Sequence, residues 1–235
     1  MDMQHQAMGY DRTATMFSPE GKLLQVEYAE KAVRLGSASI GMVCTDGVFI
    51  IADKRAEDKL LVRDSANKIV EIDSHIIASF AGILSDARIL IERAQVLAQQ
   101  HRVTYNSPIE PELVIKEIAN MQQQFTQYGG ARPFGVSMMI AGIHEKKGEV
   151  FVSDITGNYF SYHSNVIGED DEKIRNELRE KYKQAFTIKQ GVKLALEIFE
   201  KVQGTKFSIK KFELVYIDKE SVKLKKLEGE SIKEL

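Results

Sequence analysis

The chain has 235 residues, of which 43% are hydrophobic and 28% charged, an ordinary composition for a globular protein large enough to bury its own core. Its 32 basic and 34 acidic residues nearly balance, so the formal net charge of −2 favours binding neither to nucleic acid nor to an anionic membrane. No stretch approaches the roughly 18 apolar residues of a spanning helix, and residues 1–16 lack the apolar core of a signal peptide.

The beginning of the chain predicts a polar tail, residues 1–17, ahead of a single domain, residues 18–235. No linker rich in Pro, Gly and Ser, no repeat and no low-complexity segment divides that domain. The tetrapeptide Ser18-Pro19-Glu20-Gly21 is typical of a helix start, with Ser as N-cap and Pro in the first turn. Apolar residues then recur every fourth position until Gly36, a common stop signal. We therefore expect a helix over about 20–35.

Short apolar runs separated by turn residues follow this helix, and they are typical of β-hairpins. The first two runs flank Thr45-Asp46-Gly47, which contains the Asp-Gly pair preferred in tight hairpin turns. Two later runs flank Thr156-Gly157-Asn158 in the same way. The predicted strands cover residues 39–43, 48–52, 68–72, 76–80, 135–142, 150–153, 159–163, 212–217 and 222–227.

Between these strands the apolar spacing changes to three and four residues, which predicts amphipathic helices. They cover about residues 83–101, 112–125, 170–182 and 188–202. Strands thus arrive in blocks and helices in pairs, unlike the strand–helix alternation of a parallel sheet. Two antiparallel sheets packed face to face, with helix pairs on the outer faces, would bury every apolar stripe. The predicted fold is therefore α+β, a four-layer αββα sandwich.

The residues alone assemble no active site. The five histidines are scattered, and none lies at helical spacing from another or beside Cys44, so we expect no metal. The Gly-rich segment 128–135 lacks the spacing of nucleotide loops and follows a helix, so we expect a structural loop and no cofactor. The lone Cys44 lies in an apolar run with no adjacent base, which indicates buried packing in a reducing cytosol rather than catalysis.

Tyr10-Asp11-Arg12 and Phe17-Ser18-Pro19-Glu20-Gly21 begin a series of segments, in order over about residues 9–205, that closely resemble proteasome α subunits. The most specific match joins residues 10–12 to residues 17–29. The chain is most similar to the archaeal type. Further matching segments are residues 36–41, 46–48, 53–55, 68–69, 81–82, 86–88 and 127–137.

This resemblance implies the αββα sandwich of the N-terminal nucleophile hydrolases, with the helix over about 20–35 as an extra element crossing a ring face. It implies a non-catalytic subunit of a cytoplasmic protein-degrading particle. Seven copies would form a ring, and two such rings would cap two rings of β subunits. The catalytic relatives use a processed N-terminal Thr, whereas this chain has Gly36-Ser37-Ala38 at that point and no Thr.

The resemblance assigns Lys68 to a pocket that receives the C-terminal carboxylate of a regulatory ATPase. The catalytic relatives use the matching lysine to lower the pKa of their nucleophile. A lysine suits the docking role because it presents a compact charge to one carboxylate. The simpler alternative is a solvated lysine at a strand end.

Two further groups receive roles from the resemblance. One group would hold the N-terminal gate, in which the Asp11 carboxylate can accept a hydrogen bond from the Tyr28 hydroxyl. The other would line the annulus through which unfolded polypeptide passes, where small residues let seven chains approach one axis and Arg132-Pro133 would anchor the loop. The gate residues are Tyr10, Asp11, Arg12, Pro19 and Tyr28, and the annulus residues are Tyr128, Gly129, Gly130 and Ala131.

Two other functions stay open at this point. Cleavage before Ser37 would create an active Ser- or Thr-type hydrolase, but a chain-internal residue has no free α-amine to serve as base. The chain could also be a free-standing binding module that keeps only the fold. One departure from the family is Glu169-Asp170-Asp171, where a small residue and another glycine are usual after Ile167-Gly168.

Overall fold

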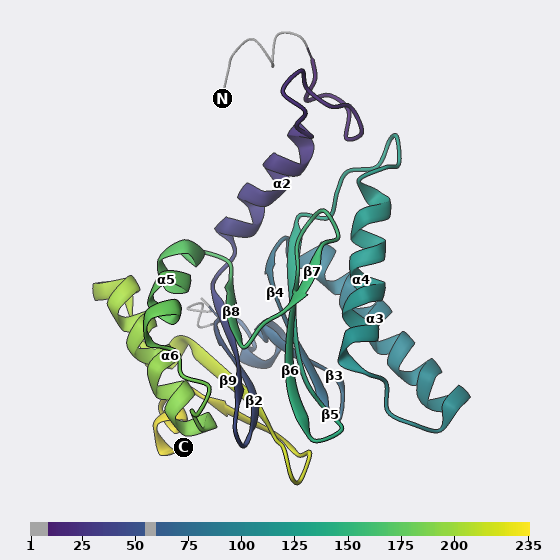
Figure 1. The fold of residues 1–235 in the computed structure, drawn as a ribbon. Coiled ribbons are helices and arrows are strands. Elements are labelled where there is room, and N and C mark those ends of the chain that lie inside the picture. Colours follow the sequence, from purple (N-terminus) through teal and green to yellow (C-terminus); the bar gives the residue numbers. More distant parts are fainter. Residues whose placement is uncertain (1–8, 55–59) are drawn as a thin grey trace.

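The computed structural model describes residues 9–54 and 60–235, and it shows four layers (Figure 1). Two five-stranded sheets lie face to face, and a pair of helices covers the outer face of each. A further helix stands ahead of the first strand, near the N-terminal end. The predicted αββα sandwich of the α+β class, with its extra N-terminal helix, is confirmed.

The first sheet has the strand order β10-β9-β2-β1-β8, and neighbouring strands run antiparallel. Its central hairpin turns at residues 45–47, where the Asp-Gly pair predicts a turn. Its strands are β1 (Ser39–Cys44), β2 (Gly47–Asp53), β8 (Ser164–Ile167), β9 (Phe212–Asp218) and β10 (Leu224–Glu228).

The second sheet has the order β3-β4-β5-β6-β7 and is also antiparallel. The single strand predicted over 159–163 is wrong at its end, because the chain changes sheets there. The Tyr162 amide still bonds to β6, whereas the next carbonyl, of His163, accepts from β1. The strands are β3 (Ile69–Asp73), β4 (Ile76–Gly82), β5 (Val136–His144), β6 (Lys147–Ser153) and β7 (Tyr159–Ser161).

Two helix pairs cover the sheets. Helices α3 (Leu84–Tyr105) and α4 (Pro111–Phe125) pack on the second sheet, and α5 (Asp171–Lys181) and α6 (Ile188–Gln203) on the first. Helix α3 runs beyond its predicted end because the left-handed Asn106 caps it. Among the helices in the described ranges, none is long and apolar enough to cross a membrane.

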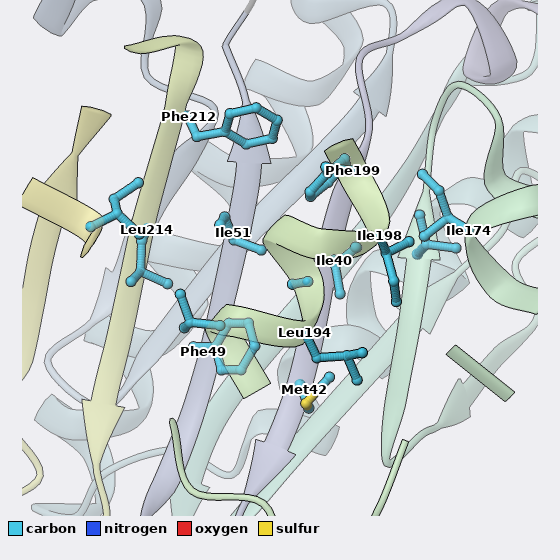
Figure 2. Close-up of a cluster of buried hydrophobic side chains, with 14 of the residues drawn as sticks. Ile40, Met42, Phe49, Ile51, Ile174, Leu194, Ile198, Phe199, Phe212 and Leu214 are labelled. Atoms are coloured by element: carbon cyan, nitrogen blue, oxygen red, sulfur yellow. The ribbon is translucent and has the colours of Figure 1, made fainter. Parts of the chain in front are cut away.

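Strand β2 contributes side chains to two of the three apolar layers of the protein. Every residue of β2 is buried, and successive side chains point to opposite faces of the sheet. Phe49 and Ile51 therefore pack against α5 and α6 (Figure 2), whereas Val48 and Ile50 pack against the second sheet. A third cluster lies between that sheet and the α3–α4 pair. Burial of each such side chain contributes about 1.5–3 kcal/mol.

The N-terminal helix α2 is Leu24–Leu35, so the predicted start near residue 20 is wrong. Residues 18–21 form a tight turn instead, in which the Gly21 amide donates to the Ser18 carbonyl at 2.8 Å. Gly21 has φ +75°, a value outside a right-handed helix. A bridge between Phe17 and Leu23 then closes the turn, and the helix begins only after it.

Candidate functional site

Lys68 and Ser37 meet where the two sheets approach the end of α2. Lys68 directly precedes β3, and Ser37 lies two residues before β1. The Lys68 ammonium donates to both the carbonyl and the hydroxyl oxygen of Ser37. Because Lys68 is only 7% exposed, the interpretation as a solvated strand-end lysine is wrong for the single chain. The structure thus fixes the Lys68 ammonium beside Ser37, and its role in docking stays a prediction.

The backbone around Ser37 is closely packed. The Gly36 amide donates to Val33 at the end of α2, and the Gly36 carbonyl accepts from Glu169 at 2.8 Å. Gly168, with φ +99°, lies so close to the Ser37 carbonyl that a side chain there would clash. In the uncleaved chain the Ser37 nitrogen belongs to a peptide group, so it cannot serve as the base that an N-terminal nucleophile uses.

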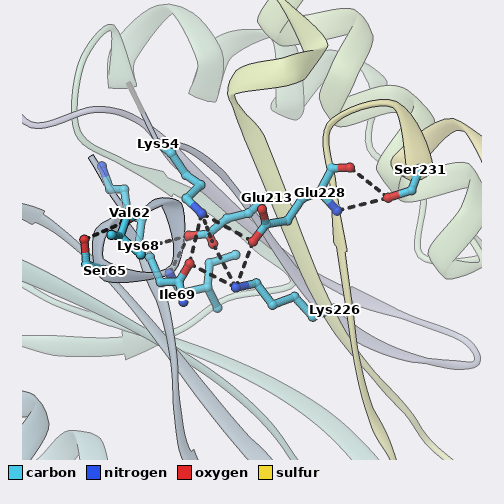
Figure 3. A network of polar contacts seen from close by, with 10 residues as sticks. Lys54, Val62, Ser65, Lys68, Ile69, Glu213, Lys226, Glu228 and Ser231 are labelled. Carbon is cyan, nitrogen blue, oxygen red and sulfur yellow. Dashed lines mark hydrogen bonds and ion pairs between the residues drawn. The ribbon is translucent and has the colours of Figure 1, made fainter. Parts of the chain in front are cut away.

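A buried carboxylate binds the backbone amide of Lys68 (Figure 3). Glu213 on β9 is fully buried, and its Oε1 accepts from the backbone amides of Lys68 and Ile69, the latter at 2.7 Å. Its Oε2 lies 3.6 Å from the Lys54 ammonium and 3.8 Å from that of Lys226. Burial raises the pKa of Glu213, and the amides and ammonium groups oppose this rise.

Sequence reasoning missed Glu213. Its local signal is an acidic residue between Phe212 and Leu214, near the start of the largely apolar run 212–217. A charged residue in such a run is rarely buried without a partner. The two amides that bond to it lie 145 and 144 residues away in the chain, so this partnership could not be predicted from spacing.

The predicted annulus residues form an exposed loop between α4 and β5. Tyr128 is 59% exposed, and the Ala131 amide turns back to the Tyr128 carbonyl at 3.4 Å. Gly130 has φ +88°, which favours glycine. At its end the loop is held by Arg132, which donates to Asp86 at the start of α3. The structure thus joins these residues into one loop, and their role in an annulus stays a prediction.

The predicted gate residues lie around the turn that precedes α2. The Arg12 amide donates to Gly9, and the Gln25 side chain donates to the Asp11 carbonyl at 2.5 Å. The Lys31 ammonium lies 5.4 Å from the centre of the Tyr28 ring. Within residues 9–54 no hydrogen bond joins the Asp11 carboxylate to the Tyr28 hydroxyl. Pro19 is exposed, and Tyr10 is partly buried. The gate role of these residues stays a prediction.

The acidic departure Glu169-Asp170-Asp171 starts helix α5. Asp170 is left-handed, with φ +54°, and accepts from Lys173 at 2.7 Å. Asp171 accepts from Arg175 at 3.1 Å, one turn further on. Negative side chains at a helix N-terminus are favourable, so the departure is accommodated locally.

The remaining polar groups suggest no other chemistry. In the part of the chain that the structure describes, no three His, Cys, Asp or Glu side chains lie close enough to hold a metal ion. Cys44 is buried, and burial, with a contribution from Asp46, raises its pKa to about 12. A thiol with such a pKa is a poor nucleophile.

Comparison with known proteins gives two family matches. A model described as "Proteasome subunit" matches residues 33–217, and a second model, the N-terminal signature of A-type proteasome subunits, matches residues 10–32. The proteasome alpha subunit of Methanococcus maripaludis is 43% identical over 195 residues, covering 83% of this chain and 75% of that protein. Proteasome alpha subunits from Thermococcus sibiricus and Methanocaldococcus jannaschii are 41% and 42% identical, and the match covers 74% of each.

Proposed function

This chain belongs to the proteasome subunit family and carries its α-type N-terminal signature, and we propose that it is a non-catalytic, gate-forming α subunit of the core particle. In this role it assembles with other proteasome subunits. Seven copies form an outer ring, and each ring lies on a ring of β subunits in the cytoplasm. The rings control which unfolded polypeptides reach the active sites of the β subunits.

The α-type signature on residues 10–32, ahead of a segment Gly36-Ser37-Ala38 that has no Thr, is the observation that carries this proposal. An N-terminal nucleophile needs a free α-amine beside its hydroxyl. Here Ser37 is held between Gly36 and the buried start of β1, and the Gly36 amide bonds to the last turn of α2. The N-terminal signature lies on the tail, the turn and most of α2, which is the part of the chain upstream of that position.

Control of access is assigned to the tail and to the exposed loop. The tail residues Tyr10, Asp11 and Arg12 precede α2. In our proposal seven such tails, one from each subunit of the ring, lie toward its centre. The loop 128–131 ends in an anchored Arg132 but is exposed at its tip, which suits a constriction formed by several copies. Pro19 and Tyr28 would support the tails from the turn and the helix.

Docking of a regulatory ATPase is assigned to Lys68. Its ammonium is fixed near the end of α2, where it donates to two uncharged oxygens of Ser37. A carboxylate is a stronger acceptor than a hydroxyl or a carbonyl oxygen. The C-terminal carboxylate of an ATPase would therefore bind the Lys68 ammonium more strongly than these two oxygens of Ser37 do.

Co-expression with an archaeal β subunit tests the proposal. We expect stacked rings by negative-stain imaging, peptidase activity only when the β subunit is present, and an α chain whose intact mass shows no internal cleavage. The matched control is a β subunit with its N-terminal Thr changed to Ala, which should give rings without activity.

The contacts between Lys68 and Ser37 favour one second candidate, a hydrolase activated by cleavage before Ser37. That candidate requires the loss of 36 residues from the mature chain. Peptidase activity of the chain alone, together with an intact mass that shows the loss of these 36 residues, would refute our proposal in favour of this hydrolase. A monomer that never forms rings, alone or with β subunits, would instead leave only a binding module.

A further inference from the structure

We propose that Glu213 is the positioning residue of the Lys68 site: it holds the backbone of Lys68 and Ile69 so that the Lys68 ammonium is presented to a carboxylate. The inference rests on the proposed docking role of Lys68. Docking would then depend also on a residue of β9, which belongs to the first sheet, whereas Lys68 precedes β3 of the second sheet.

The first argument is that one oxygen accepts two consecutive amides. Oε1 of Glu213 bonds to the amides of Lys68 and Ile69, at the point where β3 begins. Strand β3 is at the edge of its sheet, so it has a neighbouring strand on one side only. A buried amide without an acceptor is costly. Glu213 therefore supplies a bond that no strand supplies and fixes the peptide groups on both sides of the Lys68 α-carbon.

The second argument is that the same cluster also fixes the residue before Lys68. The side-chain oxygen of Asn67 accepts from Lys54 at 2.9 Å and from Lys226 at 3.0 Å. Both of these lysines face the second oxygen of Glu213. Residues 67, 68 and 69 are thus all tied to one charged cluster, and the Lys68 side chain leaves it in the direction of Ser37.

The third argument concerns charge. A fully buried carboxylate is costly unless cations and hydrogen bonds compensate it, and an apolar residue of similar size would be as stable or more so. Val215, two residues further on and therefore on the same face of β9 as Glu213, is buried in the apolar cluster between the sheets. Lys54 is 7% exposed at its side chain, and Glu228 on β10 bonds to it at 3.3 Å. The cluster therefore places two lysines around one buried acid, which is expected if the acid has a task beyond packing.

Two variants separate positioning from a general need for charge. Glu213→Gln keeps the length and the accepting oxygen but removes the charge. Glu213→Asp keeps the charge but is one methylene too short to reach both amides. Positioning predicts that Gln preserves the site and Asp does not. A role in charge balance alone predicts the reverse order.

The measurement uses the full-length chain assembled with β subunits and a short fluorescent peptide with the C-terminal sequence of an archaeal regulatory ATPase. The peptide is compared as the free acid and as the C-terminal amide. The wild type should bind the acid about tenfold more tightly or better. This preference should stay within about threefold of wild type in Glu213→Gln and be lost in Glu213→Asp. The matched control Glu230→Gln changes an exposed carboxylate and should leave the preference unchanged.

Any other pattern overturns the inference, whether both variants keep the preference, both lose it, or only Gln loses it. If the Asp variant does not assemble, hydrogen exchange of the unassembled wild-type chain decides. The Lys68 and Ile69 amides should then be protected, and exchange as fast as in an unstructured peptide would overturn the inference. A wild type that binds acid and amide equally would instead refute the docking role of Lys68 itself.

Discussion

Arg132 and Asp86 form a two-point ion pair that ties the loop after α4 to the first turn of α3. Nη1 donates to Oδ2 at 2.6 Å and Nη2 to Oδ1 at 2.7 Å, and the Gly135 amide donates to Oδ2 at 2.9 Å. The Asp86 side chain is 9% exposed and that of Arg132 is 58% exposed. The hydrogen bond from Arg132 lowers the pKa of Asp86, and burial opposes this only in part.

Asp86→Asn should lower the free energy of unfolding by about 1–3 kcal/mol at pH 7, because a buried acceptor of three hydrogen bonds is impaired. The pKa of Asp86 is lower in the folded chain than in the unfolded chain. The carboxylate therefore stabilises the fold fully above the unfolded value of about 3.9, and this stabilisation is lost as the pH falls through the folded pKa. Urea titrations of both chains should thus differ at neutral pH, and the difference should begin to shrink only as the pH falls below about 4.

The control is Glu92→Gln on the same helix. Glu92 forms an exposed pair with Arg88 at 3.9 Å, and such pairs contribute little. Two results would contradict a stabilising role of the Asp86 carboxylate. One is a Glu92→Gln chain as unstable as Asp86→Asn, and the other is a loss of stability in Asp86→Asn that does not depend on pH.

The hairpins and the layers of the fold could be predicted from the sequence. The turn at residues 45–47 and the length of the apolar runs were sufficient for the hairpins and the layers, because period and turn type are properties of neighbouring residues. The helix start at Leu24 was not predicted, because the Ser18 signal also fits the turn that the structure shows. The change of sheet after β7 was missed for a similar reason, since one run of residues feeds two sheets.

The site was only partly predictable. Lys68 could be singled out by resemblance, but its burial against Ser37 and its support from Glu213 depend on segments 31 and 145 residues away in the chain. The pair of Asp86 and Arg132 spans 46 residues. Such pairs follow from the packing of layers, which no spacing rule contains. The hydrogen bond predicted between Asp11 and Tyr28 differs from these pairs, because it is not formed within residues 9–54 of the single chain.

Deletion of residues 1–12 should raise the rate at which the assembled particle hydrolyses a small peptide, by several-fold, because the tails would no longer obstruct the axis. Tyr10→Ala and Asp11→Ala should change the same rate, since both belong to the proposed gate. The measurement is a fluorogenic peptidase assay without activator. Thr13→Ala, in the same exposed segment, is the matched control. An unchanged rate in the truncated particle would refute the gate.

Cys44 should react very slowly with alkylating reagents in the folded chain. A thiol with a pKa of about 12 is deprotonated at pH 8 on the order of a thousandfold less often than an ordinary cysteine. Burial restricts access as well. Mass spectrometry after iodoacetamide treatment should show modification only when denaturant is added. In the control Cys44→Ala with Thr45→Cys, the thiol moves to an exposed neighbour and should react readily. Rapid labelling of native Cys44 would show that this core opens.

Gly129 and Gly130 should respond differently to substitution. A side chain at either would meet no atom within 4 Å in the single chain, but only Gly130 has a left-handed φ, +88°. Gly130→Ala should therefore cost about 1 kcal/mol of stability through backbone strain. Gly129→Leu should leave the thermal unfolding of the isolated chain nearly unchanged, since its side chain enters open space.

In the assembled particle, Gly129→Leu should have the larger effect, now on the rate of protein degradation. If seven copies of the loop surround the axis, seven leucines at position 129 narrow the passage, and degradation of an unfolded protein should slow by several-fold while hydrolysis of a small peptide changes less. Glu220→Leu, in the exposed turn between β9 and β10, adds the same bulk away from this loop and should change neither rate. Equal degradation rates for Gly129→Leu and wild type would mean that the glycine is not needed for approach to an axis. The loop would then not be the constriction.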